Sequence, residues 1–476
     1  MIQNASYATN IDAPLVSTVQ AISPVFSSTP SAEERAITIA ILTPMDNSQF
    51  SSIAKLISQG IIAASHTQNQ KAEVLLIQAP EETSMQEVLE KATLEGADIV
   101  IGPVQKSQVN ALSALPHLPL PVLALNTPDA LPNPTSSGLA FFSLGTDAEA
   151  RFIAQQAITH YQKLYPNSER NNTNLALPSI TTERTSSKQK ILLIKRNNPW
   201  EERLMHNFRM RLEQHNIPYD ELDITRMPLT QLKKITQADL TTEEKEQINQ
   251  AYQRLRNRPD LDEKALQKAK LNIANRAKVL ASDNPGPYSD ILLALDAQMA
   301  SFIRSSLPST SRIWGTSSSN PGNPNTSSGA STLAYDLNLM IFADSPLLHH
   351  YDAQSFEVKF ETTMPYSLSA KRLFAFGVDA FYAALHLAKN ESHWDFQGEM
   401  GYISFNQSST PVIQRTPSLF IIQDGNLLPI STRLATQTQK IPALKIPKKE
   451  PTIEIQEVLT APVDFIVQSV QLPLNE

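Results

Sequence analysis

Hydrophobic and polar residues alternate in regular blocks along the chain from residue 36 onward. Short runs of Val, Ile, Leu and Ala are each followed by a segment whose apolar residues recur every three or four positions, the spacing of one helical face. Continuous apolar runs of this kind are typical of parallel strands that are buried on both faces. The predicted strands of this first part are AITIAILTP (36–44), EVLLIQA (73–79), GADIVIG (96–102), PVLALN (121–126) and LAFFSLG (139–145).

The same pattern begins again after residue 146 and predicts a second unit of the same kind. Near the end of the chain, GYISFN and SLFIIQDGNLLPI are typical of antiparallel strands, with Asp424-Gly425 as a hairpin turn. The fold class is therefore α/β, with two lobes in series and a parallel sheet flanked by helices in each. The predicted strand segments of the second part are KILLIKRNNPW (190–200), which leads into a helix, YSDILLALD (288–296), SRIWGTSS (311–318) and LNLMIFADSP (337–346).

Several polar residues mark the predicted helix starts. A Thr followed three residues later by Glu or Gln can form a capping box, in which each side chain bonds the other residue's backbone N–H. Pro199 suits the first position of a helix, where no N–H is needed, and Ser369 is a candidate cap for the helix over 370–384. The predicted capping boxes are Thr83 with Gln86, Thr146 with Glu149, and Thr241 with Glu244.

Three segments depart from this alternation. Residues 1–35 are rich in Ser, Thr, Ala and Pro and are predicted to form a disordered tether. Residues 226–282 are highly charged and helical, which predicts an insertion into the second lobe. The tail over 436–476 is punctuated by Pro and is predicted to be extended or loosely attached.

Composition narrows the classes of function. The net charge of −7 and the pI of about 5.8 argue against a nucleic-acid-binding protein, which needs clustered Lys and Arg. The absence of Cys excludes disulfides and thiolate chemistry in these 476 residues. No apolar run is long enough to predict a transmembrane helix. The segment MIQNASYATNIDAPLVSTVQ lacks the features of a signal peptide, which leaves either a cytosolic protein or a leader not visible in the sequence.

Motifs for catalysis are missing. The sequence has no phosphate-binding loop, dinucleotide-binding turn, nucleophile elbow or zinc-protease motif, so no catalytic residue, cofactor or metal is predicted. The pair His349-His350 lacks a nearby third ligand and is predicted to lie in a solvated loop. Asp290, Asp296 and Asp344 each lie next to an apolar run; capping of a helix or turn is the simplest role, and we favour it for Asp296.

A crevice between the lobes is the candidate ligand site, because parallel strands present their carboxyl ends to such openings. Gly102-Pro103 is predicted to form the structural turn at one of these strand ends. Each polar candidate also suits a simple turn or cap, because these residue types dominate turns. The crevice candidates are Asp46, Asn126, Thr127, Arg196, Asn197, Thr316 and Ser317.

The order of these motifs resembles the type I periplasmic-binding-protein fold, and in particular the penicillin-binding protein activator (LpoA) family. The resemblance rests on IAILTPMDNSQFSSIAKLISQGIIAA, GADIVIGPVQKSQVNAL and PVLALN in the first lobe, and on RLFAFGVDAFYAA and the closing strands. It implies a two-lobed domain over 36–435, with a first lobe over about 36–145 and a second over about 146–345. The late segments over 346–435 would return to both lobes.

The resemblance also implies a function. Members of this family are outer-membrane lipoproteins of the periplasm that bind and stimulate a bifunctional penicillin-binding protein, which synthesises peptidoglycan. The lipidated Cys and helical repeats of such proteins are not seen here, so an outer-membrane anchor is not visible. The 226–282 insertion and the 166–189 loop are candidate contact surfaces.

Two other functions stay open from the sequence. One is a periplasmic receptor that closes its lobes over an amino acid or related ligand, with Asp46 and Arg196 as its charged clamp. The bulky turn over residues 45–50 argues against a tight backbone cradle for such a ligand. The other is a cytosolic enzyme or sensor.

Overall fold

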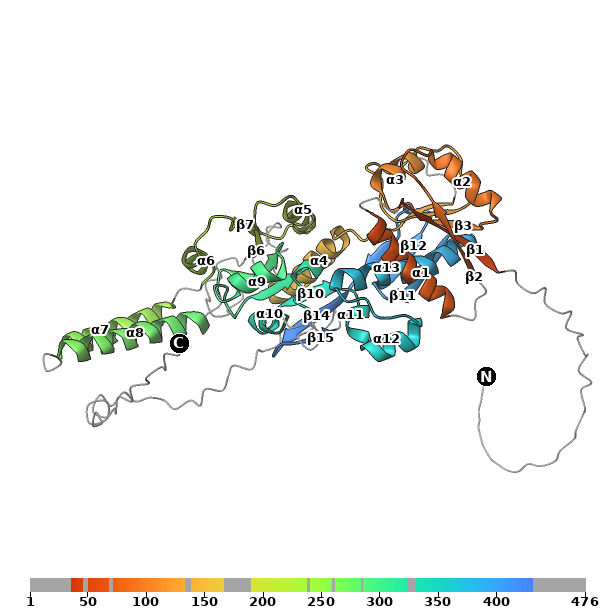
Figure 1. The fold of residues 1–476 in the computed structure, drawn as a ribbon. Helices are drawn as coiled ribbons and strands as arrows, with labels where there is room; N and C mark the ends of the chain where they lie inside the picture. Colours follow the sequence, from red (N-terminus) through yellow and green to blue (C-terminus); the bar gives the residue numbers. More distant parts are fainter. Residues whose placement is uncertain are drawn as a thin grey trace, which may run out of the picture.

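The computed structural model describes residues 36–45, 50–67, 72–132, 138–166, 190–237, 240–258, 262–283, 286–322 and 330–430. Two α/β lobes lie side by side, and a helical hairpin extends from the second lobe (Figure 1). The predicted tether over 1–35, the tail over 436–476 and most of the 166–189 loop lie outside the described residues. None of the described helices is both long and apolar enough to span a bilayer.

The first lobe is built on a five-stranded parallel sheet with the order β2-β1-β3-β4-β5. One face is covered by α2 and α3, and the other by α1 together with helices from late in the chain. The elements are β1 (Ile37–Thr43), α1 (Ser51–His66), β2 (Ala72–Gln78), α2 (Met85–Leu94), β3 (Ile99–Ile101), α3 (Lys106–Ser113), β4 (Val122–Ala124) and β5 (Leu139–Phe141).

The second lobe is built on a seven-stranded sheet with the order β15-β14-β10-β9-β8-β6-β7. Its strands are parallel apart from the final hairpin, whose turn places Asp424 and Gly425 at positive φ, as predicted for this dipeptide. The strands are β6 (Lys190–Lys195), β7 (Tyr219–Asp223), β8 (Tyr288–Leu293), β9 (Arg312–Gly315), β10 (Ile341–Asp344), β14 (Ser418–Gln423) and β15 (Asn426–Ile430).

Helices cover both faces of this second sheet. One face packs against α4 (Asp147–Leu164) and α5 (Pro199–Gln214), and the other against α6 (Leu229–Thr236), α9 (Ala297–Arg304) and α10 (Ala330–Asp336). The charged insertion forms α6 and then the projecting hairpin of α7 (Thr242–Arg256) and α8 (Glu263–Asp283) (Figure 1). The insertion is therefore helical, as its sequence predicts.

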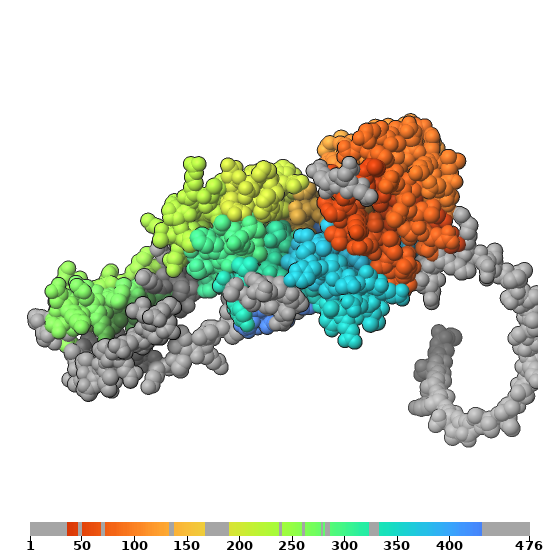
Figure 2. Space-filling model, in the orientation of Figure 1, coloured from red at the N-terminus to blue at the C-terminus, as the bar shows by residue number. Residues whose placement is uncertain are grey.

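Late segments complete the core of the first lobe. After β10 the chain forms α11 (Leu347–His350), α12 (Ala353–Phe360) and α13 (Leu368–Ala388), and then a three-stranded sheet of β11 (His393–Gly398), β12 (Gly401–Asn406) and β13 (Gln414–Thr416). The apolar side chains of these elements join the core beneath β1, β3 and β4. The described chain thus passes between the lobes three times, before α4, after β10 and after β13. Figure 2 shows the late part of the chain, in cyan to blue, against the orange to red first lobe.

Some local predictions differ from the structure. The α2 helix is capped by Ser84 rather than Thr83, and α13 by Ser367 rather than Ser369, because the apolar stripe fixes the helix only to within a residue or two. His349 does not lie in a solvated loop. It belongs to α11, and its ring packs 3.9 Å from that of Phe420, so burial lowers its pKa to about 4.

Prediction from the packing of α1 against α13. These helices approach so closely at Gly60 and Gly377 that a Cβ at residue 377 would lie 2.1 Å from the carbonyl oxygen of Ile57. Gly377→Ala should therefore lower the free energy of unfolding by about 1–3 kcal/mol, because the backbones must separate. Urea denaturation measures the loss. Gly145→Ala is the matched control, because this exposed Gly has ordinary φ and only the Ser143 hydroxyl nearby; an equal effect of both variants would contradict the packing argument.

Candidate functional site

The second-lobe candidates lie at the carboxyl ends of β6, β8 and β9. Arg196 is already paired: its guanidinium donates to Glu201 at 2.7 Å and to Asp296 at 2.6 Å. Asp296 also caps α9 by accepting from the backbone N–H of Met299, as predicted. Because its charge is matched within the protein, Arg196 is not an open clamp for a ligand carboxylate.

The other strand-end residues of this lobe form local bonds. Buried Thr316 bonds the hydroxyl of Ser318 at 2.8 Å, and Ser318 in turn donates to the carbonyl of Leu295. Exposed Asn197 donates its backbone N–H to the hydroxyl of Thr225. These contacts are those of turns that hold strand ends together.

The first-lobe candidates are separate from those of the second lobe. Asn126 donates to the carbonyl of Val104 at 3.1 Å and accepts from the backbone N–H of Thr127, so it ties together the loops after β3 and β4. Gly102-Pro103 is a cis peptide at the end of β3. Asp46 lies outside the described residues. In the described part, no hydrogen bond joins Asn126 or Thr127 to a second-lobe candidate.

Ser317 is the predicted residue that lies where the lobes meet. It follows β9 in a short 3₁₀ turn (η2, Ser317–Ser319). Its backbone N–H donates to Glu149 at 3.1 Å, and its carbonyl accepts from Arg372 at 2.9 Å. Glu149 belongs to α4 of the second lobe, and Arg372 to α13, which packs into the first lobe.

Arg372 forms an ion pair across the junction. Its Nε and Nη2 donate to the two oxygens of Asp344 at 2.8 and 2.6 Å, the two-point geometry that makes Arg–carboxylate pairs strong. Asp344 ends β10, is fully buried, and also accepts from Asn320 at 2.7 Å. Burial acts to lower the pKa of Arg372, but the charge of Asp344 outweighs it and raises the pKa above the usual value. The guanidinium therefore stays charged.

A second ion pair joins the same region. Arg415 of β13 donates to Glu149 at 3.0 Å, and the side chains are only 2% and 4% exposed. The Nε and Nη1 atoms of Arg415 have no hydrogen-bond partner in the described structure. Two first-lobe arginines thus pair with two second-lobe carboxylates, and the peptide of Ser317 lies between the pairs.

We call these residues the interlobe cluster. Two of its members had a sequence signal that suggested another role: Glu149 matches a capping box with Thr146, and Asp344 follows an apolar run. Thr146 makes no capping bond in the structure, because its backbone is helical (φ −71°, ψ −6°) rather than extended as in a capping residue. The Glu149 carboxylate is directed to Arg415 instead of to the backbone of Thr146. The arginines carried no signal. The cluster comprises Glu149, Ser317, Asn320, Asp344, Arg372 and Arg415.

Behind the cluster, buried hydrogen bonds fix the chain after β10. The hydroxyl of Ser345 donates to the carbonyl of Glu399 at 2.6 Å. The backbone N–H groups of Glu399 and Met400 each donate to one oxygen of Asp379 at 2.7 Å. Burial of Asp379 raises its pKa to about 8, although these two donors act in the opposite direction. The β11–β12 turn is thereby tied both to α13 and to the point where the chain leaves the second lobe.

The chemistry of this arrangement is positioning rather than reaction. Its carboxylates are matched by guanidinium or backbone N–H groups, so none of them is placed as a free base. No group of three His, Asp or Glu residues in the described ranges could hold a metal ion. The interlobe cluster fills the base of the junction with the protein's own side chains.

Comparisons with known proteins match the first part of the chain. Residues 31–163 match the family model described as "LppC putative lipoprotein". This segment of the chain, which is less than half of its length, resembles that family. A segment of 73 residues is 41% identical to the penicillin-binding protein activator LpoA of Pectobacterium parmentieri, and it spans 14% of this chain and 10% of that protein.

Solved structures share the two-lobed fold. The LpoA C-domain of Haemophilus influenzae, described as a regulator of PBP1A, has a TM-score of 0.51 and 15% identity, covering 83% of this chain and 100% of that one. A "putative branched-chain amino acid ABC transporter" from Chromobacterium violaceum has a TM-score of 0.52 and 19% identity, covering 81% and 99%. The resemblance to LpoA and the type I periplasmic-binding-protein fold are thus confirmed.

Prediction for the interlobe cluster. Arg415→Met leaves Glu149 buried and without its charged partner, which should lower the free energy of unfolding by about 3–5 kcal/mol. The double variant Glu149→Gln/Arg415→Met should recover most of this loss. Urea denaturation of all three variants measures the coupling.

The control for that experiment is the exposed pair of Lys106 and Asp129, whose side chains are 49% and 72% exposed. Lys106→Met should cost at most about 1 kcal/mol. If Arg415→Met costs no more than Lys106→Met, the interlobe pair does not have the role described.

Prediction for Asp379. Its pKa of about 8 lies above the value of about 3.9 for an unfolded Asp, so between these pH values only the unfolded chain releases the proton. The contribution of Asp379 to the free energy of unfolding should therefore fall as pH rises from about 4 to about 8, by up to about 1.4 kcal/mol per unit. Buried His349, whose pKa is lowered to about 4, contributes in the opposite direction below about pH 6.5. The net fall should therefore be seen from about pH 6.5 to about 8. Asp379→Asn should remove this slope, as measured by urea denaturation across that range. Exposed Asp395→Asn should keep it; an unchanged slope in Asp379→Asn would refute the assignment.

Proposed function

We propose that this protein is a non-catalytic regulator that binds and stimulates a bifunctional peptidoglycan synthase, a penicillin-binding protein. Support comes from the matched segment of the Pectobacterium activator and from the likeness of fold to the Haemophilus regulator of PBP1A. The synthase of the same organism is the partner to test.

The observation that carries the proposal is the interlobe cluster. A solute receptor of this fold needs an open crevice and a hinge. Here two arginines and two carboxylates of the two lobes are paired and largely buried at the junction. Closing over a ligand would require these ion pairs to move or break, at a cost of several kcal/mol. A regulator that acts through its outer surface has no such requirement.

The proposal includes a location. The matched family is described as a lipoprotein, and the curated relative is a penicillin-binding protein activator. We therefore infer a periplasmic protein associated with the outer membrane through an anchor that is not visible in this sequence. Peptidoglycan synthesis takes place in that compartment.

The α7–α8 hairpin is the surface that we propose for contact with the synthase. It extends beyond the second sheet and its helices (Figure 1). Leu271 lies on α8 with 59% of its surface exposed, beside exposed Lys264 and Lys268. Tyr252 on α7 is also exposed, and aromatic side chains are enriched at interaction surfaces.

Prediction for the partner. The purified chain should bind the periplasmic part of the synthase saturably and increase its rate of peptidoglycan synthesis. Calorimetric titration measures binding, and incorporation of labelled lipid-linked precursor measures the rate. Absence of binding at tens of micromolar, on the order of −6 kcal/mol, would overturn the proposal.

A pair of matched variants tests the surface. Leu271→Glu on α8 should weaken binding by about tenfold, because it places a charge in the contact. Leu94→Glu, at an 88% exposed position of α2 in the first lobe, should leave binding unchanged. If Leu94→Glu weakened binding and Leu271→Glu did not, the synthase would still be the partner, but the contact would be on the first lobe.

A further inference from the structure

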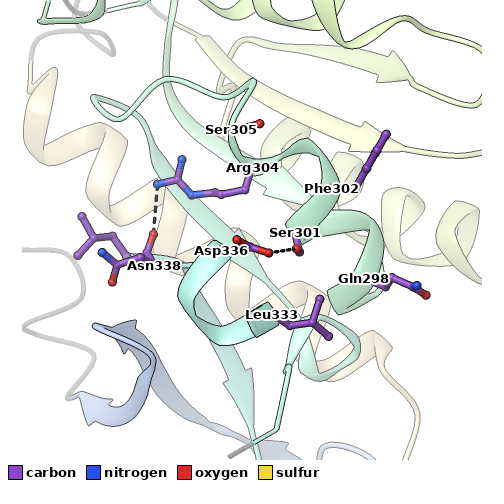
Figure 3. A pocket seen from close by; sticks show the side chains of 9 residues that line it. Gln298, Ser301, Phe302, Arg304, Ser305, Leu333, Asp336 and Asn338 are labelled. Carbon is purple, nitrogen blue, oxygen red and sulfur yellow. Dashed lines mark hydrogen bonds between the residues drawn. The ribbon is translucent and has the colours of Figure 1, made fainter. Parts of the chain in front are cut away.

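A pocket of about 600 Å³ lies on the second lobe between α9 and α10. Its lining comes from α9, from the end of α10 and from the turn before β10 (Figure 3). Helix α9 starts at the carboxyl end of β8 and runs back along the sheet. Its carboxyl end and the start of β10 therefore lie near the amino ends of the strands, whereas the interlobe cluster lies at their carboxyl ends. The pocket is therefore separate from the interlobe junction. Its size is within the usual range for small-molecule sites.

Arg304 is the main polar group of this pocket. Its Nη2 donates to the carbonyl of Asn338 at 3.2 Å, while its buried Nε has no hydrogen-bond partner in the described structure (Figure 3). Burial lowers the pKa of this guanidinium. No carboxylate of the described residues forms an ion pair with it, whereas Arg196 of the same lobe and the two arginines of the interlobe cluster are each paired. A guanidinium in a pocket without an anion partner is a site suited to a carboxylate.

The other residues that line the pocket form an apolar part and a polar part. Phe302, Leu333 and Leu339 are apolar, and Phe302 is 62% exposed. Asp336 is on the α10 wall and accepts from the hydroxyl of Ser301 at 3.0 Å (Figure 3). An apolar ligand body would cover the exposed ring of Phe302, which is a favourable burial of apolar surface.

We propose that this pocket binds a small molecule or chain end in which a free carboxylate is attached to an apolar body. The carboxylate would bond the guanidinium of Arg304, and the apolar body would lie against Phe302 and Leu333. Two sources share this chemistry, a free apolar amino acid and the C-terminal residue of a peptide. The proposal is independent of the synthase partner, because none of the residues that line the pocket belongs to the α7–α8 hairpin.

The test uses the full chain and ligand-observed NMR with four probes at up to about 10 mM. N-acetyl-leucine carries the carboxylate without a charged amine, N-acetyl-leucinamide lacks both charges, and leucine and leucinamide are their free-amine counterparts. N-acetyl-leucine should bind and N-acetyl-leucinamide should bind about tenfold more weakly. Stronger binding of leucine than of N-acetyl-leucine would indicate a free amino acid, with its ammonium near Asp336, and the reverse would indicate a peptide C-terminus.

Variants connect the binding to the pocket. Arg304→Gln should weaken binding of N-acetyl-leucine by about tenfold or more, since it removes a charge-assisted hydrogen bond. Arg203→Gln, an exposed position on α5, is the matched control and should have no effect. Phe302→Ala changes an exposed residue, so the fold should be retained, and binding should weaken by about threefold or more.

Three results would overturn the proposal. These are absence of binding of both carboxylate probes, equal binding of N-acetyl-leucine and N-acetyl-leucinamide, or binding that Arg304→Gln and Phe302→Ala leave unchanged. The last result would place the bound probe elsewhere on the chain. Each is independent of the result with the synthase.

Discussion

Two buried Arg–carboxylate pairs between the lobes are the constraint on which this structure depends. A buried charge is costly unless a partner of opposite charge and further hydrogen bonds accompany it. Arg372 and Arg415 come from first-lobe elements, whereas Glu149 and Asp344 come from the second lobe. Neither lobe can satisfy its own charges at the junction without the other. The lobes therefore have one favoured arrangement, and the charges act to specify it.

Helix α13 connects this junction to the core of the first lobe. It carries Arg372 near its start, Gly377 against α1, and Asp379 against the β11–β12 turn. Arg372 and Asp379 are seven residues apart and lie on one side of the helix, whereas Gly377 lies on another. A shift of α13 would therefore affect all three contacts at once. The turn that Asp379 holds also accepts the hydroxyl of Ser345, where the chain leaves the second lobe. The position of the lobes is consequently tied to the interior of the first lobe as well as to the ion pairs.

Much of the fold could be predicted from the sequence because the central strands of both sheets are apolar and the helices have clear stripes. Strand β7 (YDELD) lies at the edge of its sheet, has no such apolar run and was not predicted. The Thr241–Glu244 capping box and Pro199 at a helix start are confirmed, since both depend on residues at most three positions apart. The junction could not be predicted in this way. Glu149 pairs with Arg415, 266 positions away, instead of completing the capping box that the local pattern indicates. Asp344 and Arg372 are 28 positions apart, on elements of different lobes.

The difference between local and long-range contacts also explains why the crevice candidates form bonds within their own lobes. Polar residues at strand ends were predicted to line a crevice because parallel strands all present the same end to it. Arg196, Asn126 and Thr316 do lie at strand ends, but each has a partner within its own lobe, and only the packing of later elements decides that.

Arg304 is the contrasting case: it lies within the amphipathic helix that follows β8, with nothing in its sequence to indicate a site, and yet its Nε has no partner in the described structure. The turn before β10 links its pocket to the strand that ends in Asp344. Continuity along one strand does not by itself couple two sites. A ligand at Arg304 would influence the junction only if its affinity differed between two arrangements of the lobes, and the paired charges at the junction favour a single arrangement.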